Sequence, residues 1–276
     1  MNSANSSSTF RRRIGFAAAT AVAAAVVAAT PGTAAAQPAT GSAGGQKPTV
    51  VLVHGAFADS SSWNGAIGDL SRDGYRVIAA ANPLRGLDSD ADYVASIVKD
   101  IAGPVVLVGH SYGGSIISKA AREAGNVKSL VYIAASAPDE GENTLTAGGP
   151  DLPHTEVGKA LCPHPIPDGV DLYLDHGKFH DTFAQDVPAE QAAVMAATQR
   201  PVKAGAFEGV FTGQPAWKSL PSYYLVSGAD HVIHPDAQRA MAKRIGAKKV
   251  VEVDSSHAVA VSHPHETADL IRAAAQ

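Results

Sequence analysis

Residues 105–123 read VVLVGHSYGGSIISKAARE. The first four residues are apolar and uncharged, which is typical of a strand buried on both faces of a sheet. A helix-like segment follows at residues 116–123, and the pattern G-x-S-x-G lies between the two at residues 109–113. A strand, a sharp turn and a helix in this order expose the serine hydroxyl above the end of the strand. The stretch therefore predicts an α/β fold and makes Ser111 a candidate nucleophile.

Five further apolar runs have the character of buried strands. They lie at residues 49–53, 75–80, 127–134, 223–226 and 249–253. Helix-like stretches separate most of these runs. Two of these stretches begin with polar residues that are typical of helix N-termini, at residues 59–62 and 88–92. Strands that alternate with helices predict a mostly parallel, twisted sheet with helices on both faces and right-handed crossovers.

One interval, from Pro138 to Trp217, shows no strand pattern over about eighty residues. Because a structureless loop of this length is improbable in a compact domain, we expect an inserted helical lid at about residues 139–215. Large apolar side chains in or next to this interval are candidates for lining an apolar substrate pocket or for covering the core. They are Phe179, Phe183, Met195, Phe207, Phe211 and Trp217.

A serine hydroxyl needs a base, and the base needs a third group that orients it. Asp230 lies in SGADHVIHP, directly after one predicted strand, and His257 lies in DSSHAVAV, directly after the last one. Open α/β sheets place their sites at these carboxyl ends. The order Ser111, Asp230, His257 is one of the known chain orders of a Ser-His-Asp triad. We expect His257 to move the proton and Asp230 to hold its imidazole.

Three other carboxylates compete with Asp230 for the role of the acid. Asp139 and Glu140 follow the predicted strand at residues 127–134, so position alone makes them rivals. Asp254 is only three residues from His257, which is too close in sequence to orient the imidazole well.

The segment His54-Gly55-Ala56-Phe57 follows the first predicted strand and supplies a candidate oxyanion hole. Negative charge that develops on a carbonyl oxygen needs preorganised N–H donors. We expect these to be the backbone N–H groups of Ala56 and of Tyr112, the residue after the nucleophile, with Phe57 as the alternative to Ala56. The side chain of His54 is assigned to holding the loop and not to acting as a base.

Four of these segments, VVLVHGAF, GHSYGG, SGADHVIHP and SSHAV, carry a family resemblance. In order and spacing they resemble the α/β-hydrolases over residues 48–276. They are particularly similar to the compact branch that contains bacterial esterases, plant methylesterases and hydroxynitrile lyases. The resemblance implies a core sheet, an inserted lid, a Ser-Asp-His triad, a small-molecule ester substrate and no cofactor.

The chain departs from some members of that family. No counterpart of the antiparallel strands that open larger members is visible, and HGAF replaces the HGGG of some lipases and esterases, which argues against bulky esters of tertiary alcohols. Plant hydroxynitrile lyases carry a lysine near the acid, whereas His231 follows Asp230 here. A serine esterase for esters of small to medium size is therefore favoured. The alternatives are amide, lactone, C–C or C–CN cleavage by the same triad, or a binding protein on a hydrolase scaffold.

The first 36 residues have the order of a secretory signal peptide. Arg11, Arg12 and Arg13 precede an uncharged, alanine-rich run, and small residues at 34–36 offer a cleavage site. We expect cleavage near Ala36 and a flexible linker at residues 37–47. The general secretory route is favoured for export, and the twin-arginine route stays the alternative. Since the run is short and only weakly apolar, it does not predict a stable membrane span. Cleavage would lower the formal net charge from −4 to −7.

Composition excludes several other classes of protein. With 45% hydrophobic and 17% charged residues, the chain is neither disordered nor a multi-span membrane protein. The acidic balance offers no basic surface for nucleic acid. A single cysteine, Cys162, rules out an internal disulfide, and it has no positioned base. His176 and His180 have a spacing that could bind a metal on a helix, but Gly177 is expected to interrupt that helix, so no metal site is predicted.

Overall fold

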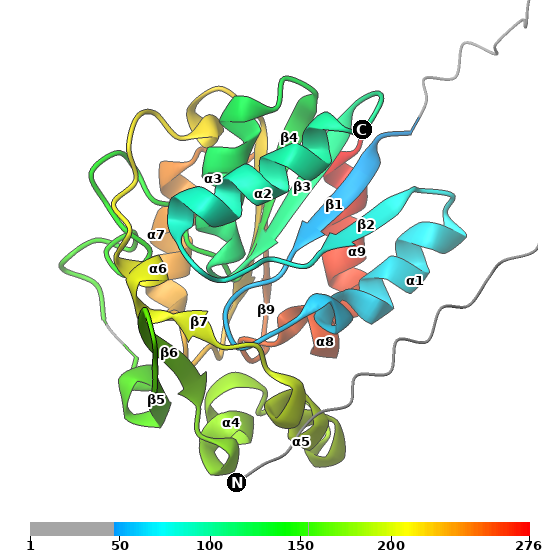
Figure 1. Ribbon diagram of the computed structural model, residues 1–276. Coiled ribbons are helices and arrows are strands. Elements are labelled where there is room, and N and C mark those ends of the chain that lie inside the picture. Colours follow the sequence, from blue (N-terminus) through cyan, green and yellow to red (C-terminus); the bar gives the residue numbers. More distant parts are fainter. Residues whose placement is uncertain (1–46, 154) are drawn as a thin grey trace, which may run out of the picture. The chain divides into compact units, whose positions relative to one another are not determined.

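The computed structural model describes residues 47–153 and 155–276. The expected signal peptide at residues 1–36, and residues 37–46 of the expected linker, lie outside these ranges. The described part contains a central sheet of six parallel strands in the order β2-β1-β3-β4-β8-β9 (Figure 1). The strands are β1 (Thr49–Val53), β2 (Val77–Ala80), β3 (Val105–His110), β4 (Val127–Ile133), β8 (Ser222–Ser227) and β9 (Lys249–Val253). All six strands predicted from the apolar runs are present, and each neighbouring pair is parallel.

Helices cover both faces of this sheet. One face carries α2 (Leu87–Lys99), α3 (Gly113–Glu123) and α7 (Pro235–Arg244), and the other carries α1 (Asn64–Arg72), α8 (Val259–Ser262) and α9 (Pro264–Ala274). A short 3-10 turn (Ser60–Trp63), capped by the side chain of Asp59, leads into α1. No helix in residues 47–153 or 155–276 is long and apolar enough to cross a membrane.

The core lies in two layers because successive side chains of a strand point to opposite faces. In β1, Val51 and Val53 enter the layer under α2 and α3, whereas Val50 and Leu52 enter the layer under α9, and all four are fully buried. Strands β1 and β3, at the centre of the sheet, are therefore buried at every position, as expected for a parallel sheet covered on both sides.

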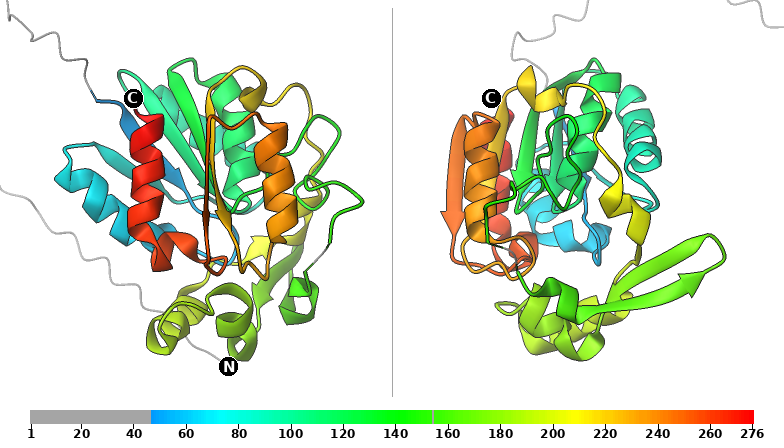
Figure 2. Two further views of the ribbon diagram at one scale, coloured as in Figure 1. Left: turned by 180° about the vertical axis from the view of Figure 1, so that it is seen from behind. Right: turned by 90° about the vertical axis from the view of Figure 1, so that its left-hand side faces the viewer.

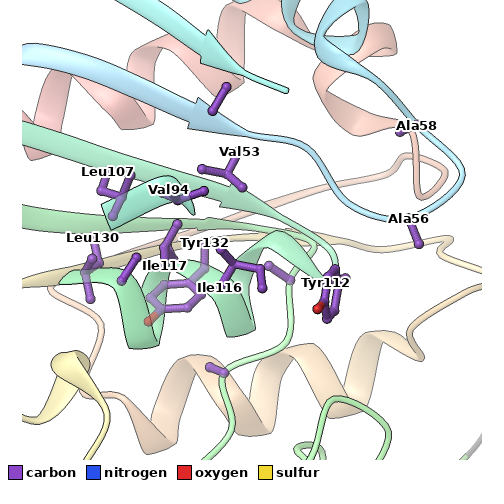
Figure 3. Close-up of a cluster of buried hydrophobic side chains, with 14 of the residues drawn as sticks. Val53, Ala56, Ala58, Val94, Leu107, Tyr112, Ile116, Ile117, Leu130 and Tyr132 are labelled. Atoms are coloured by element: carbon purple, nitrogen blue, oxygen red, sulfur yellow. The ribbon is translucent and has the colours of Figure 1, made fainter. Parts of the chain in front are cut away.

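Figure 3 shows part of the first layer. Leu107 and Leu130, from neighbouring strands, pack there against Ile116 and Ile117 of α3. Tyr112 lies at the end of the same cluster, on the turn between β3 and α3. The packing of the core thus fixes the turn that carries the candidate nucleophile.

The lid is inserted between β4 and β8 and lies at the carboxyl ends of the central strands (Figures 1 and 2). Its helices are α4 (His176–Phe183), α5 (Ala189–Thr198) and α6 (Ala204–Glu208), and short 3-10 turns lie at Val157–Ala160 and Ala216–Lys218. It also contains an antiparallel sheet of β5 (Leu161–Ile166), β6 (Gly169–Leu174) and β7 (Val202–Lys203).

The lid sheet corrects the expectation that this interval has no strands. In β5, LCPHPI contains two prolines and most of its side chains are exposed, so it lacks the apolar run by which buried strands were recognised. The β5–β6 hairpin projects from the body of the molecule in the right-hand view of Figure 2. Prolines at the free edge of β5 also block pairing with a further strand.

Candidate active site

Ser111 occupies the sharp turn between β3 and α3. Its backbone has φ +55°, in the left-handed region that residues other than glycine rarely adopt. The turn is held because the Ser111 carbonyl accepts hydrogen bonds from Gly114 N at 3.0 Å and Ser136 N at 3.1 Å. Only glycine fits at position 113, since a Cβ there would lie 2.5 Å from the carbonyl oxygen of Val53. Ser111 lines a cavity of about 410 Å³.

Asp230 and His257 meet at the same edge of the sheet. They come from the loops after β8 and β9, and Asp230 Oδ2 lies 2.6 Å from His257 Nδ1. Both side chains are buried. Asp230 Oδ1 accepts from the N–H groups of Val232 and Ile233, at 2.7 and 3.0 Å. Because Nδ1 faces a carboxylate it carries the proton, which leaves Nε2 of the neutral ring free to act as a base.

His257 Nε2 is buried, and no residue in the described ranges hydrogen-bonds to it. His110, directly before Ser111, packs its ring 4.7 Å from the His257 ring and donates from Nε2 to the His257 carbonyl at 2.9 Å. This contact fixes the base-bearing loop beside the turn of Ser111. Burial holds the pKa of His110 well below the ordinary value, so it stays neutral and does not repel a protonated His257.

The three rival carboxylates lie elsewhere. Asp139 pairs with Lys218 at 2.6 Å, and Glu140 accepts from Gly213 N at 3.1 Å. Asp254 is exposed to solvent. Of the four acids considered from the sequence, only Asp230 is in hydrogen-bond contact with His257 within the described part of the chain.

Two backbone N–H groups next to Ser111 are available for an oxyanion. Within residues 47–153 and 155–276, neither Ala56 N nor Tyr112 N has a hydrogen-bond partner, whereas Phe57 N donates to Arg200 O at 3.2 Å. The N–H group of Ala56 is therefore available to an oxyanion, whereas that of Phe57, the alternative expected from the sequence, is already engaged. Figure 3 shows Ala56 on the loop after β1 and Tyr112 on the turn after β3. A Cβ at Gly55 would lie 2.5 Å from Ser111 Cβ, so only glycine lets this loop come so close to the serine.

His54 ties down the loop that carries Ala56. Its Nδ1 donates to Gly55 O at 2.9 Å, and the His54 carbonyl accepts from Asn82 Nδ2 at 3.0 Å. Burial lowers the pKa of His54 to about 4, so the ring is neutral at physiological pH. These contacts agree with the structural role expected for this histidine.

The cavity at Ser111 is largely apolar. The side chains of Leu152, Val157, Leu172, Phe207 and Met241 are among those that line it. Of the six large lid residues considered from the sequence, only Phe207 is among the lining residues. Phe179, Phe183, Phe211 and Trp217 are buried in the core cluster, and Met195 packs against it.

The hydroxyls in the wall of this cavity are already engaged. Thr144 Oγ1 lies 3.0 Å from Ser115 Oγ, Ser136 Oγ donates to Thr144 O at 3.3 Å, and Thr155 Oγ1 donates to Val232 O at 2.9 Å. Apart from Ser111, Glu208 and His234, the wall therefore resembles a ligand pocket that selects by shape and hydrophobicity more than by polar contacts.

Residues 183–186, at the end of α4 and in the loop after it, hold the base-bearing and acid-bearing loops. Phe183 O accepts from Ala258 N at 3.0 Å, and its ring lies 5.0 Å from that of His257. Asp186 Oδ2 accepts from Ser256 N at 3.0 Å, and Gln185 Nε2 donates to Ala229 O at 2.6 Å. This part of the lid is a fixed wall of the site.

Of the two histidines considered as metal ligands, His176 is exposed and His180 is engaged in another contact. Both lie on α4, and Gly177 lies within its first turn instead of interrupting it, because Asp175 caps the helix by accepting from Gly177 N. His180 Nε2 donates to Val187 O at 2.9 Å. No cluster of three or more potential ligand residues occurs in the part of the chain that the structure describes.

Sequence reasoning missed three residues that hold the site: Gln238, Asp186 and Asp90. Gln238 contacts Asp230, Asp186 contacts the loop of His257, and Asp90 Oδ2 accepts from the Tyr112 hydroxyl at 3.0 Å. Each is a polar residue that the fold buries wholly or in part, and no local motif distinguishes it from a surface residue.

The sequence profile of the alpha/beta hydrolase family matches residues 50–270. The chain belongs to this family. Two curated relatives are similar to this α/β hydrolase over most of their length. A pyrethroid hydrolase of Sphingobium wenxiniae is 27% identical over 80% of this chain and 85% of its own. A carbendazim hydrolyzing esterase of a Nocardioides species is also 27% identical, over 81% of this chain and 98% of its own.

A solved structure shows the same fold. The crystal structure of polyneuridine aldehyde esterase superposes with a TM-score of 0.69 at 20% identity, over 84% of this α/β hydrolase and all of the esterase chain. The fold class and the branch of the family expected from the sequence are therefore confirmed.

Proposed function

We propose that this α/β hydrolase is a serine esterase that cleaves carboxylic esters of small to medium size through an acyl-enzyme. The observation that carries the proposal is a convergence at one edge of the sheet. Ser111 lines an apolar cavity, His257 is paired with Asp230, and two N–H groups that have no partner among the described residues lie beside the serine. The named activities of the pyrethroid hydrolase and the carbendazim esterase support ester chemistry.

In the proposed first step, Ser111 Oγ attacks the ester carbonyl carbon while its proton passes to His257 Nε2. The N–H groups of Ala56 and Tyr112 stabilise the oxyanion, and Asp230 stabilises the imidazolium. The C–O bond to the alcohol then breaks, and the alcohol leaves with the proton from Nε2. In the second step, His257 takes a proton from water, the hydroxide attacks the acyl carbonyl, and Ser111 regains its proton as the acid leaves.

The test is hydrolysis of p-nitrophenyl acetate, butyrate, octanoate and palmitate by the full chain, beside Ser111→Ala. Each methylene buried in the cavity contributes about 0.8 kcal/mol, so kcat/KM should rise with acyl length until the cavity is filled. We expect octanoate to exceed acetate and palmitate, with a burst of p-nitrophenol. Ser111→Ala should lower kcat by several orders of magnitude, to roughly the 10³–10⁴-fold rate over water left by the oxyanion hole and binding.

Three outcomes would contradict this proposal. If Ser111→Ala, purified free of host esterases, kept most of the activity, Ser111 would not be the nucleophile. If the native enzyme neither hydrolysed any ester nor reacted with a fluorophosphonate, a binding role would replace the esterase. Labelling of Ser111 without turnover of esters would point to another reaction of the same triad.

We also propose that the protein is exported and that the signal peptide is cleaved near Ala36. The support is the order of residues 1–36: an arginine cluster, an uncharged alanine-rich run and small residues at the cleavage site. Mass spectrometry of the protein from its native host measures the N-terminus directly. A mature chain that begins at Met1 would contradict export by this route.

A further inference from the structure

Gln238 lies on the first turns of α7 and is fully buried behind Asp230. Its side-chain amide makes three hydrogen bonds. Nε2 donates to Asp230 Oδ2 at 2.7 Å and to Ile233 O at 2.8 Å, and Oε1 accepts from Ser227 N, at the end of β8, at 3.0 Å. The amide therefore joins the sheet, the loop of the acid and the acid itself.

Gln238 donates to the same oxygen of Asp230 that accepts from the base, His257. Asp230 Oδ2 accepts from Gln238 Nε2 and from His257 Nδ1, while Oδ1 accepts from the backbone of Val232 and Ile233. Four donors thus surround the carboxylate, and both oxygens are fixed. Without the amide, Oδ2 would have His257 alone, and only the two backbone donors on Oδ1 would oppose rotation of the carboxylate about its Cβ–Cγ bond.

A neutral donor suits this position. An amide orients the carboxylate without supplying positive charge, so the negative charge of Asp230 remains available to a protonated His257. The titratable groups that face the amide are Asp230 and, beyond it, His257. Asp236 and Arg239, on the same helix, pair with each other at 2.5 Å at the surface, and Arg239 also pairs with Glu252.

We propose that Gln238 is a positioning residue of the esterase, which holds Asp230 Oδ2 in line with His257 Nδ1. The inference rests on the proposed function, because it assigns Gln238 to the triad of that reaction. Removing the amide should misplace the imidazole, and a misplaced catalytic group lowers the rate of the chemical step more than it lowers substrate binding.

The test compares Gln238→Met with Gln199→Met. Gln199 is a matched control because it is also buried and its amide also makes three hydrogen bonds: two with the backbone of Leu174 and one with Ala196 O. Both substitutions replace an amide by an unbranched apolar side chain and remove three buried hydrogen bonds, so both should lower Tm. Only the first removes a contact with Asp230.

We expect Gln238→Met to lower kcat by about 10- to 100-fold with KM within about two-fold. Gln199→Met should keep kcat within about two-fold at a similar loss of Tm. Equal kcat in the two variants would overturn the inference while leaving the esterase intact. Absence of ester hydrolysis by the native enzyme would instead count against the proposed function.

A second readout does not require turnover. In the native protein the Nδ1–H proton of His257, held against Asp230, should give a low-field proton NMR signal. This signal should broaden or vanish in Gln238→Met and persist in Gln199→Met. An unchanged signal in Gln238→Met would overturn the inference whatever the activity.

Gln238→Glu covers the case in which the methionine variant does not fold. The introduced carboxyl group still accepts from Ser227 N, and while it keeps a proton it donates to Asp230 Oδ2. When it loses that proton, two like charges face each other. We therefore expect kcat of this variant to decline with rising pH over a range where native kcat is constant. A native-like pH profile would overturn the inference.

Discussion

Ser111 carries a backbone conformation that the surrounding structure must impose. A positive φ at a residue other than glycine costs about 1–3 kcal/mol, and such residues cluster at functional sites. In the described ranges they are Phe57, Leu84, Ser111 and Ala134. All four directly follow, or lie within a few residues of, the carboxyl ends of β1, β2, β3 and β4. The strain is therefore concentrated at the edge of the sheet where the candidate site lies.

The assignment of the acid is tested by Asp230→Asn. An asparagine in this position offers an amide to His257, so the imidazole loses both its orienting contact and the charge that stabilises its protonated form. We expect kcat to fall by about 10⁴-fold with a small change in KM. Steady-state kinetics of Asp254→Asn and Glu140→Gln provide the controls, and both should remain near the native rate. A larger loss in either control than in Asp230→Asn would transfer the role to that acid.

At the scale of elements, the lid has two parts with different attachments. The β5–β6 hairpin projects outward, and Asp171 on β6 joins it to the body through Arg85 at 2.6 Å. The end of α4 and the loop after it instead bind the loops of His257 and Asp230 directly. A motion that lifted the whole lid would break the hydrogen bonds of the second part. Movement that admits substrate is therefore expected in the hairpin and not at the end of α4.

Asp186 tests whether the lid positions the base. Asp186→Ala removes the acceptor for Ser256 N and should release the loop that carries His257, so we expect kcat to fall by about 10-fold or more. Asp186→Asn keeps an acceptor oxygen at the same place and should restore most of the loss. The measurement is kcat and KM for both variants, with Tm as a check on folding. Equal rates in the alanine and native proteins would show that the loop is held without the lid.

The elements that sequence could predict are those with a simple burial pattern. Strands β1 and β3 are buried along their whole length because both faces of the sheet are covered. The ends of β3, β8 and β9 locate Ser111, Asp230 and His257, although β9 is a largely exposed strand at the edge of the sheet. The lid hairpin could not be predicted, since the burial of β5 is low and its prolines argue against a strand. Asp186 was missed for a different reason: its partner Ser256 is 70 residues away, and only the folded chain brings them together.

On the scale of the whole molecule, two buried histidines link the site to stability. His54 and His110 are almost inaccessible to solvent, and burial lowers the pKa of both: His54 to about 4, and His110 well below its ordinary value. In the unfolded chain the same rings bind a proton at a pH of about 6.5. The unfolded state therefore binds more protons than the folded state in mildly acidic solution, and stability is lost as the pH falls.

This loss can be measured through His54. Above about pH 6.5 both states leave the ring neutral, and between that pH and about pH 4 only the unfolded state protonates it. The free energy of unfolding should fall by up to about 1.4 kcal/mol per pH unit for each such histidine.

In His54→Asn the amide can still donate to Gly55 O but binds no proton. Denaturant unfolding between pH 7 and about 4.5 should show a shallower pH dependence than that of the native protein, by up to about one proton. The carboxylates, which begin to titrate at the acid end of this range, are the same in both proteins and do not produce this difference. His164→Asn, at an exposed position on β5, should leave the native slope unchanged. An equal slope in His54→Asn and the native protein would mean that His54 takes up its proton in the folded state as easily as in the unfolded chain.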